Sequence, residues 1–213
     1  MSTRTILSTA GRLAGAAVCV ISLASCGGEM LRTGRAPMFL VISNMSASAG
    51  GSSSGSGSAF LLSDVQVLVD TDVNGVTVKV PTVFNDAATA TIQTVAKNPS
   101  ATPTEINTVT LTRYHVAFRR TDGRNTPGVD VPYSFDGGLG VSIGPNSSAS
   151  VAFEIVRHQA KLEPPLKNLI AGGGFGFIST IAEITFYGFD QNGNEVSVTG
   201  RIDVQFGDFG DDQ

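Results

Sequence analysis

The two histidines of this 213-residue chain are the first residues to consider for catalysis. His115 and His158 lie in separate segments that we predict to be strands. A serine hydrolase needs a histidine beside a serine on a strained turn, and no Gly-x-Ser-x-Gly sequence lies near either histidine. We therefore interpret both as partly exposed strand residues, and we expect no catalytic site.

Paired carboxylates are the second chemistry to consider. A glycosidase needs two acids across a cleft, and Glu154, Glu163 and Glu183 are the candidates. Because nothing in the sequence pairs any two of them, a hydrolase is the least favoured class of function.

The turn from Asp190 to Glu195 brings several side-chain oxygens together. Asp190, Asn192 and Asn194 are therefore weak candidates for binding a hard cation such as Ca²⁺. The glycine comes too early for an EF-hand loop, and Asn, Asp and Gly are also the residues that tight turns prefer. We expect a turn that holds no metal, and we expect no cofactor elsewhere.

Four acids near the C-terminus would either add cation ligands or keep this end of the chain soluble. We favour solubility for these residues, which are Asp203, Asp208, Asp211 and Asp212.

The glycine-rich segment 172–177 contains two phenylalanines, Phe175 and Phe177. It is not a phosphate-binding loop, because no Lys-Ser/Thr pair follows and the chain continues as a strand. We expect a mobile loop whose rings insert into the core. If the rings were exposed instead, they would form a small apolar patch for a partner.

The N-terminal segment is typical of an export signal. Arg4 and Arg12 give it positive charge, and the apolar run 13–24 has the length of a signal core rather than of a membrane span. The junction Leu23-Ala24-Ser25-Cys26 follows this run and resembles the lipobox of bacterial lipoproteins.

This resemblance implies that residues 1–25 are a lipoprotein signal peptide and that Cys26 is the lipidation site. Its thiol would receive diacylglycerol, and a third acyl chain would follow on the new amino terminus. The alternative is an ordinary signal whose cleavage site happens to precede a cysteine. Gly27, where proteins held at the inner membrane commonly have Asp, favours the outer membrane if the cell has one.

Cysteine usage agrees with this interpretation. Cys19 would leave with the signal, so that Cys26 would be the one cysteine of the mature chain. The folded domain would then have no disulfide, zinc cluster or catalytic thiol.

Charge argues against a nucleic-acid partner. The whole chain carries −4, and removal of residues 1–25 takes away two arginines and no acid, which leaves 12 basic and 18 acidic side chains, or −6. Four arginines could still form a basic patch, although we favour guanidinium groups solvated on the outer face of a strand: Arg113, Arg119, Arg120 and Arg124.

Behind the anchor we expect a tether over residues 26–58, and the folded domain over residues 59–213. The apolar run 38–42 predicts one possible strand within the tether. The segment 46–58 consists almost wholly of Ser, Gly and Ala, which is typical of a flexible linker.

Apolar residues at every second position predict strands through most of the remaining chain. Asn74-Gly75 and Asn192-Gly193 predict hairpin turns. In the run from Ile106 to Arg120 the alternation changes phase, which predicts a bulge near Thr112. Pro164-Pro165 interrupts any ladder, and the residues after it form at most a short helical turn.

Eight or nine short strands with no long helix predict an all-β fold, an antiparallel β-sandwich. The stretch from Tyr187 to Val196 resembles the closing hairpin of bacterial immunoglobulin-like domains, and this resemblance implies an immunoglobulin-like sandwich. The Cys, Trp and Cys core of antibody domains is missing, so that only the general sandwich is implied.

We therefore expect an envelope lipoprotein, held at the membrane by its lipid anchor, that presents a non-enzymatic binding or structural module. The alternative is a domain that binds a surface glycan or another envelope protein through the loops 122–130 and 172–177.

Overall fold

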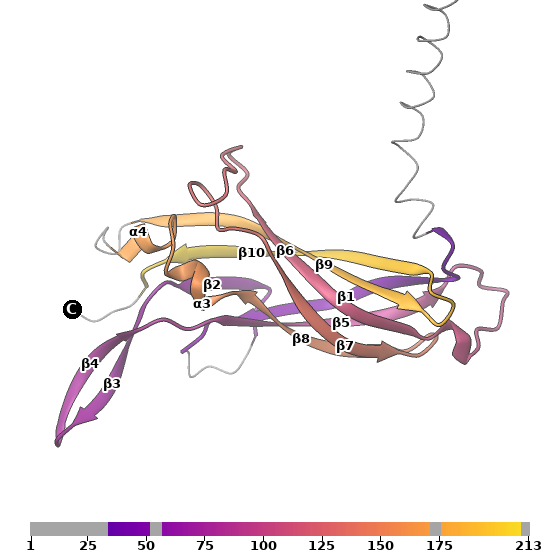
Figure 1. The fold of residues 1–213 in the computed structure, drawn as a ribbon, viewed down its shortest axis with the longest axis horizontal. Helices are drawn as coiled ribbons and strands as arrows, with labels where there is room; N and C mark the ends of the chain where they lie inside the picture. The colour runs from indigo at the N-terminus through magenta and orange to yellow at the C-terminus, as the bar shows by residue number, and fades with distance from the viewer. Residues whose placement is uncertain (1–33, 52–56, 171–175, 210–213) are drawn as a thin grey trace, which may run out of the picture.

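A computed structural model describes residues 34–51, 57–170 and 176–209 of the chain (Figure 1). Ten strands make up most of these residues: β1 Met38–Ser48, β2 Phe60–Asp64, β3 Val67–Val73, β4 Val76–Thr82, β5 Asp86–Ala96, β6 Val109–Arg119, β7 Phe135–Ile143, β8 Ser148–Val156, β9 Phe177–Asp190 and β10 Glu195–Gly207. The described helices are short: η1 Glu105–Asn107, α3 His158–Lys161 and α4 Lys167–Ile170.

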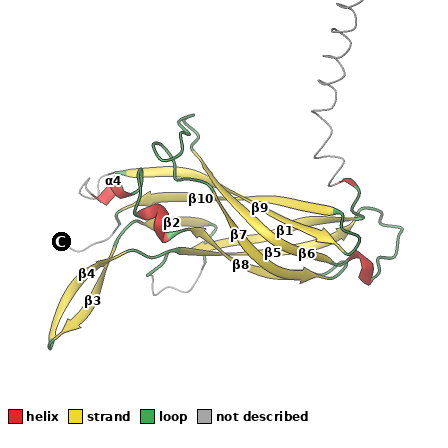
Figure 2. Cartoon of the chain, viewed as in Figure 1, coloured by secondary structure: helices red, strands yellow, loops and turns green. Residues whose placement is uncertain are grey.

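Two sheets form the body of the molecule. The smaller has the order β1-β5-β8 and the larger has the order β2-β10-β9-β6-β7. Figure 2 shows these strands as the two layers of a sandwich, so that the predicted all-β sandwich is confirmed. Strand pairs are antiparallel except for β2 and β10, which run parallel.

Period-two alternation builds the core between the sheets. Along β9, every second residue from Ile178 to Asp190 is buried, while the residues between them face outward. Aromatic rings join the layers, because Phe153 of the smaller sheet lies 5.2 Å from Phe186 and 5.3 Å from Tyr114 of the larger sheet, measured between ring centroids. Rings at these separations add to the stabilisation that burial provides.

The predicted bulge in β6 is confirmed. The register with both neighbouring strands shifts between Leu111 and Arg113. One extra residue at this point lets Leu111 and Tyr114 both face the core, although they lie in opposite phases of the alternation.

Both predicted hairpin turns are also confirmed. Asn74 and Gly75 have positive φ angles of 56° and 81°, as the turns that match strand twist require. Gly193 has a φ of 77° and joins β9 to β10.

Strand β1 is longer than the predicted run 38–42. It pairs with β5 from Met38 to Ser48, so that Ser46, Ala47 and Ser48 belong to the sandwich and not to a linker. Small side chains fit here because Ala47 is buried against the core. The folded body therefore begins at β1 rather than at residue 59.

Two further segments differ from expectation. Strand β7 was not predicted because glycines at positions 137, 138 and 140 hide its alternation. His158 lies in α3 and not on a strand.

The two adjacent glycines of β7 give a test of the packing. A Cβ at Gly137 would lie 2.2 Å from the Tyr114 ring, whereas a Cβ at Gly138 would have no heavy atom within 4 Å. We expect Gly137→Ala to lower the free energy of unfolding by about 1–3 kcal/mol through overpacking. Gly138→Ala should change it by less than ~0.5 kcal/mol. Urea denaturation of the two variants measures the difference, and equal stabilities would contradict this packing.

Candidate functional site

Cys26, the signal segment and its lipobox lie outside the described residues. The described chain approaches the sandwich at Ala36, which is buried, and enters β1 two residues later. Within the part that the structure describes, no helix is long and apolar enough to cross a membrane.

The carboxylate of Asp190 is engaged by its own turn. Its Oδ1 accepts the backbone N–H groups of Asn192 at 2.9 Å and Asn194 at 2.8 Å, and its Oδ2 accepts the Asn194 side-chain amide at 2.8 Å. The donors stand where a cation would have to lie. Across residues 34–51, 57–170 and 176–209, no cluster of three or more His, Cys, Asp or Glu residues could hold a metal ion.

The sequence-predicted acids each have a different partner. Glu154 accepts a hydrogen bond from Asn85 at 2.7 Å, and Glu163 accepts one from Gln159 at 2.8 Å. Glu183 lies on the outer face of the larger sheet instead.

Glu183 joins two strands on that outer face. It lies 2.7 Å from Arg119 of β6 and 2.9 Å from Arg201 of β10. The hydrogen bond from Arg119, together with that from Arg201, lowers the pKa of the Glu183 carboxyl. This acid therefore stays ionised as part of a surface ion network, and it is not poised as a general acid.

His115 lies on the same outer face. Its Nδ1 is 3.3 Å from Asp136, which also accepts a hydrogen bond from Arg113 at 2.9 Å. The Arg113 guanidinium stacks 3.9 Å from the centroid of the Tyr187 ring. His158 lies on α3 instead, where it is exposed.

The remaining arginines of the predicted basic patch share one acid. Arg120 and Arg124 lie 2.6 Å and 2.9 Å from Asp122. Hydrogen bonds from Arg120 and Arg124 hold the pKa of Asp122 well below its usual range. The loop 120–130 also contains Asp130, so that its two arginines and two acids give it no net charge.

A buried ion pair is the feature that sequence reasoning missed. Lys161 Nζ lies 2.8 Å from Asp86 Oδ1, and both side chains are fully buried. The Gly50 N–H donates to Oδ1 at 2.8 Å and the Ser63 hydroxyl donates to Oδ2 at 2.6 Å. Burial raises the pKa of Asp86, while the Lys161 ammonium opposes that rise. The one signal in the sequence is the position of Asp86, which stands two residues before the buried Ala88 and therefore on the same, inward face of β5.

A groove lies beside the loop that precedes β7. It has a volume of about 110 Å³, and its lining includes Pro132, Tyr133, Phe135, Arg157, Gln159 and Glu163. Tyr133 is 58% exposed and lies at the edge of the groove. The Arg157 guanidinium stacks 4.0 Å from the Phe135 centroid and donates a hydrogen bond to the Asp136 carbonyl. We name this feature the Tyr133 groove.

The Tyr133 groove combines an exposed ring with hydrogen-bonding groups that neighbouring contacts hold in place. Such a mixture suits a ligand with an apolar face and polar edges, such as a sugar ring or a peptide side chain. The predicted loop 122–130 lies close by, since Asn125 and Pro127 line a neighbouring hollow that Pro132 also lines.

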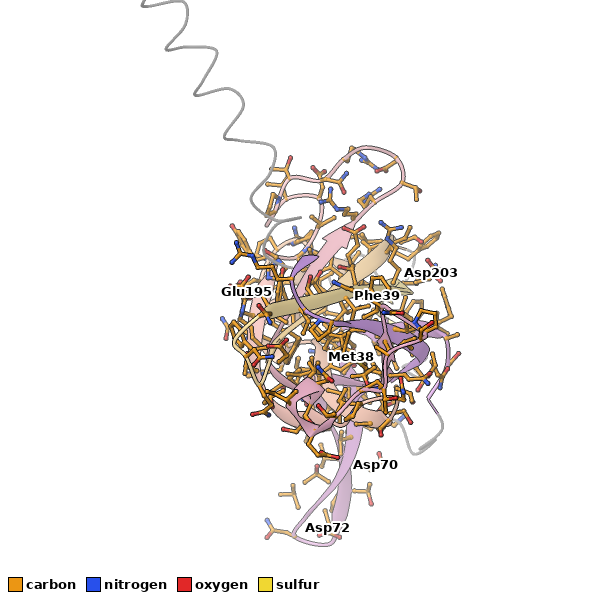
Figure 3. The ribbon with its side chains drawn as sticks, turned by 90° about the vertical axis from the view of Figure 1, so that its right-hand side faces the viewer. Met38, Phe39, Asp70, Asp72, Glu195 and Asp203 are labelled. Atoms are coloured by element: carbon orange, nitrogen blue, oxygen red, sulfur yellow. The ribbon has the colours of Figure 1, made fainter. Side chains whose placement is uncertain are left out.

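A further hollow of about 300 Å³ lies where the described chain begins, and Figure 3 labels Met38 and Phe39 from its lining. Lys97 covers the Phe39 ring at 5.2 Å and donates a hydrogen bond to the Gly34 carbonyl at 3.0 Å. The polar groups here are engaged with the chain itself.

Phe177 is 62% exposed, contrary to the expectation that it inserts into the core. Ile178 takes the inward phase at the start of β9, which turns Phe177 outward. Residues 172–175 of this glycine-rich segment lie outside the described residues.

The buried ion pair predicts a large and pH-dependent effect. Lys161→Met leaves the Asp86 carboxylate buried without a counter-charge, and we expect a loss of about 3–5 kcal/mol in the free energy of unfolding at pH 7. Lys167→Met, which changes an exposed lysine on α4, is the control and should have little effect.

Acid should relieve that loss. A carboxyl with a raised pKa in the folded state gains stability as the pH falls through that pKa, so that the deficit of Lys161→Met shrinks on acidification. Adding Asp86→Leu should recover most of the loss, because both charges are then gone. Urea denaturation at several pH values measures both effects, and a deficit that stays constant with pH would contradict the assignment.

No family model and no curated protein matches the chain. The X-ray structure of Northeast Structural Genomics Consortium target SoR45 is similar over 83% of this chain and 91% of that chain, with 9% sequence identity and a TM-score of 0.34.

Proposed function

We propose that this chain is a cell-envelope lipoprotein whose β-sandwich acts as a binding or structural module. The observation that carries the proposal is the sequence Leu23-Ala24-Ser25-Cys26, which follows a positively charged segment and an apolar run. Each buried CH₂ of an acyl chain contributes ~0.8 kcal/mol to membrane binding, so that two or three chains on one terminus anchor the protein stably.

The short distance between Cys26 and the sandwich supports this proposal. Nine residues, 27–35, separate the cysteine from the buried Ala36. An extended chain spans at most ~3.3–3.6 Å per residue, so that the tether can reach roughly 30 Å. The folded body is therefore kept close to the membrane that holds the anchor.

A binding role for the module is favoured over hydrolysis. Among the residues that the structure describes, the three candidate acids have separate partners and the two histidines lie on different elements, β6 and α3. The Tyr133 groove instead offers an exposed ring beside fixed polar groups. We infer that a surface glycan, or a side chain of another envelope protein, binds there.

Replacement of Cys26 tests the anchor. In Cys26→Ser the acyl acceptor is gone, and we expect the protein to lose lipidation and to move from the membrane fraction to the soluble fraction. Cys19→Ser is the matched control, because Cys19 lies within the proposed signal and should leave partitioning unchanged. Mass spectrometry of the N-terminal peptide and membrane fractionation are the measurements. An unmodified N-terminus in the parental chain would overturn the proposal.

Replacement of Tyr133 tests the groove. We expect the chain to bind at least one member of a panel of surface glycans, and Tyr133→Ala to weaken that binding by about tenfold or more, as truncation of a central aromatic typically does. Val129→Ala is the control, because Val129 is also exposed, at 67%, on the neighbouring loop but does not line the groove. Equal affinity of the two variants, measured by calorimetry, would rule out the groove.

A further inference from the structure

The β3–β4 hairpin has one face made wholly of β-branched residues. The register pairs Val67 with Thr82 and continues to the pair Val73 and Val76, and paired residues share a face. The members of this valine face are Val67, Val69, Thr71, Val73, Val76, Val78, Val80 and Thr82. Four of these valines are 39–62% exposed, namely Val73, Val76, Val78 and Val80.

The opposite face of the hairpin carries Leu68 and Pro81 at its base and is polar towards its tip. It pairs Asp70 with Lys79 and Asp72 with Thr77. Figure 1 shows the hairpin projecting from the sandwich as an arm, and Figure 3 shows Asp70 and Asp72 along it. A two-stranded hairpin alone is marginally stable in water, so that an apolar face on it favours an additional packing partner.

A second apolar surface lies on the outer face of the larger sheet, at its β2 edge. Phe60 and Leu62 are 42% and 49% exposed there, and Phe177 is 62% exposed on β9, two strands away. Strand β10 lies between them and places Asp203 and Gln205 on the same face, followed by Gly207, which lies under the Phe209 ring. We name Phe60, Leu62, Phe177 and Phe209 the sheet-edge patch.

The arm and the patch lie at the same end of the molecule, away from the end where residue 34 enters it (Figure 1). The base of the arm is fixed, because β2 ends just before it and β5 starts just after it. The Ser63 hydroxyl of β2 donates a hydrogen bond to Asp86 of β5 at 2.6 Å, and this buried contact joins the two strands between which the arm leaves the sandwich.

We propose that two copies of this chain form a symmetric dimer in which each arm lays its valine face on the sheet-edge patch of the other copy. This inference does not depend on the lipid anchor or on the Tyr133 groove. A twofold axis near this end exchanges the two arms, so that one symmetric contact covers both apolar surfaces of both copies. The polar face of each arm, with Asp70 and Lys79, then remains in water.

The available area supports a second copy as the occupant. A half-exposed phenylalanine offers on the order of 100 Å², and a half-exposed valine or leucine offers on the order of 80 Å². One arm on one patch then removes on the order of 600 Å² from water, and the reciprocal pair removes on the order of 1,200 Å². Stable interfaces begin at about this size, whereas a single arm on a single patch falls below it.

The mass of the full chain, purified in mild detergent, is the first test. Light scattering should give a dimer, and Val76→Asp combined with Val78→Asp should weaken its association at least tenfold. Thr77→Asp is the matched control, because Thr77 lies between them on the polar face, and it should leave the dimer intact. Leu62→Asp should weaken the dimer from the other side of the contact.

The substituted side chains are exposed, so that circular dichroism should show folded protein in every variant. A parental chain that is monomeric at all concentrations would overturn the proposal, as would an arm variant that is folded and still dimeric.

Photo-cross-linking tests the geometry in cells that express the chain. A photoreactive amino acid at position 78 should cross-link to peptides around Phe60–Asp64 or Phe177–Ile181 of a second, isotope-labelled copy. The same group at position 77 should not. Cross-links from one arm to the other arm would overturn the arrangement. Cross-links only to lipid or to a different protein would show that another occupant covers the valine face.

Discussion

The structure at one end of the sandwich depends on how the buried carboxylate of Asp86 is stabilised. A charge in an apolar interior is costly unless its own partners replace water, and here three donors do so. They come from α3, from β2 and from the turn after β1, and none of these segments adjoins β5 in sequence. The ion pair and its two hydrogen bonds therefore tie these three segments to β5. They also close the base from which the arm leaves the sandwich, so that the same contacts orient a surface that lies well outside the core.

Charged and apolar side chains are unevenly distributed over the described surface. On the outer face of the larger sheet, the arginines of β6 and β10 meet acids across neighbouring strands, and such exposed pairs add little to stability but leave a well-hydrated surface. Exposed apolar side chains lie instead on the arm, at the β2 edge, and on β1 and β5 of the smaller sheet, at Phe39, Val41 and Val95. Alternation explains both outcomes, because a strand whose inward positions are filled by Ile178 or Leu61 must present its other residues to solvent. Where those residues are charged, the outer face of the sheet is hydrated. Where they are Phe177 or Leu62, the outer face is apolar and suits a binding partner.

Much of the fold could be predicted from short-range patterns. The Asn-Gly turns follow from residues that readily adopt positive φ angles, and the bulge near Thr112 follows from the change of phase in the apolar alternation. Both signals are visible in short stretches of sequence. The full length of β1 and the existence of β7 could not be predicted, since serine, alanine and glycine carry no alternation and gain their strand geometry from neighbours such as β5 and β6. The Lys161 pair was beyond sequence reasoning for a similar reason, because its partner is 75 residues away. Of the candidate sites, Asp190 fits the interpretation as a turn residue, and the Tyr133 groove was anticipated only as a nearby loop.

The parallel pairing of β2 with β10 has a consequence for how the chain reaches its folded state. Residues 60–64 find their sheet neighbour at residues 203–207, close to the C-terminal end of the sequence. Contacts of such high sequence separation form late, because the loop they close is long. Any process that delivers the chain N-terminus first will leave β2 without its ladder partner, and Leu61 without its place in the core, until residues 203–207 have emerged. The β2 edge of the larger sheet therefore forms only after β10 has been delivered.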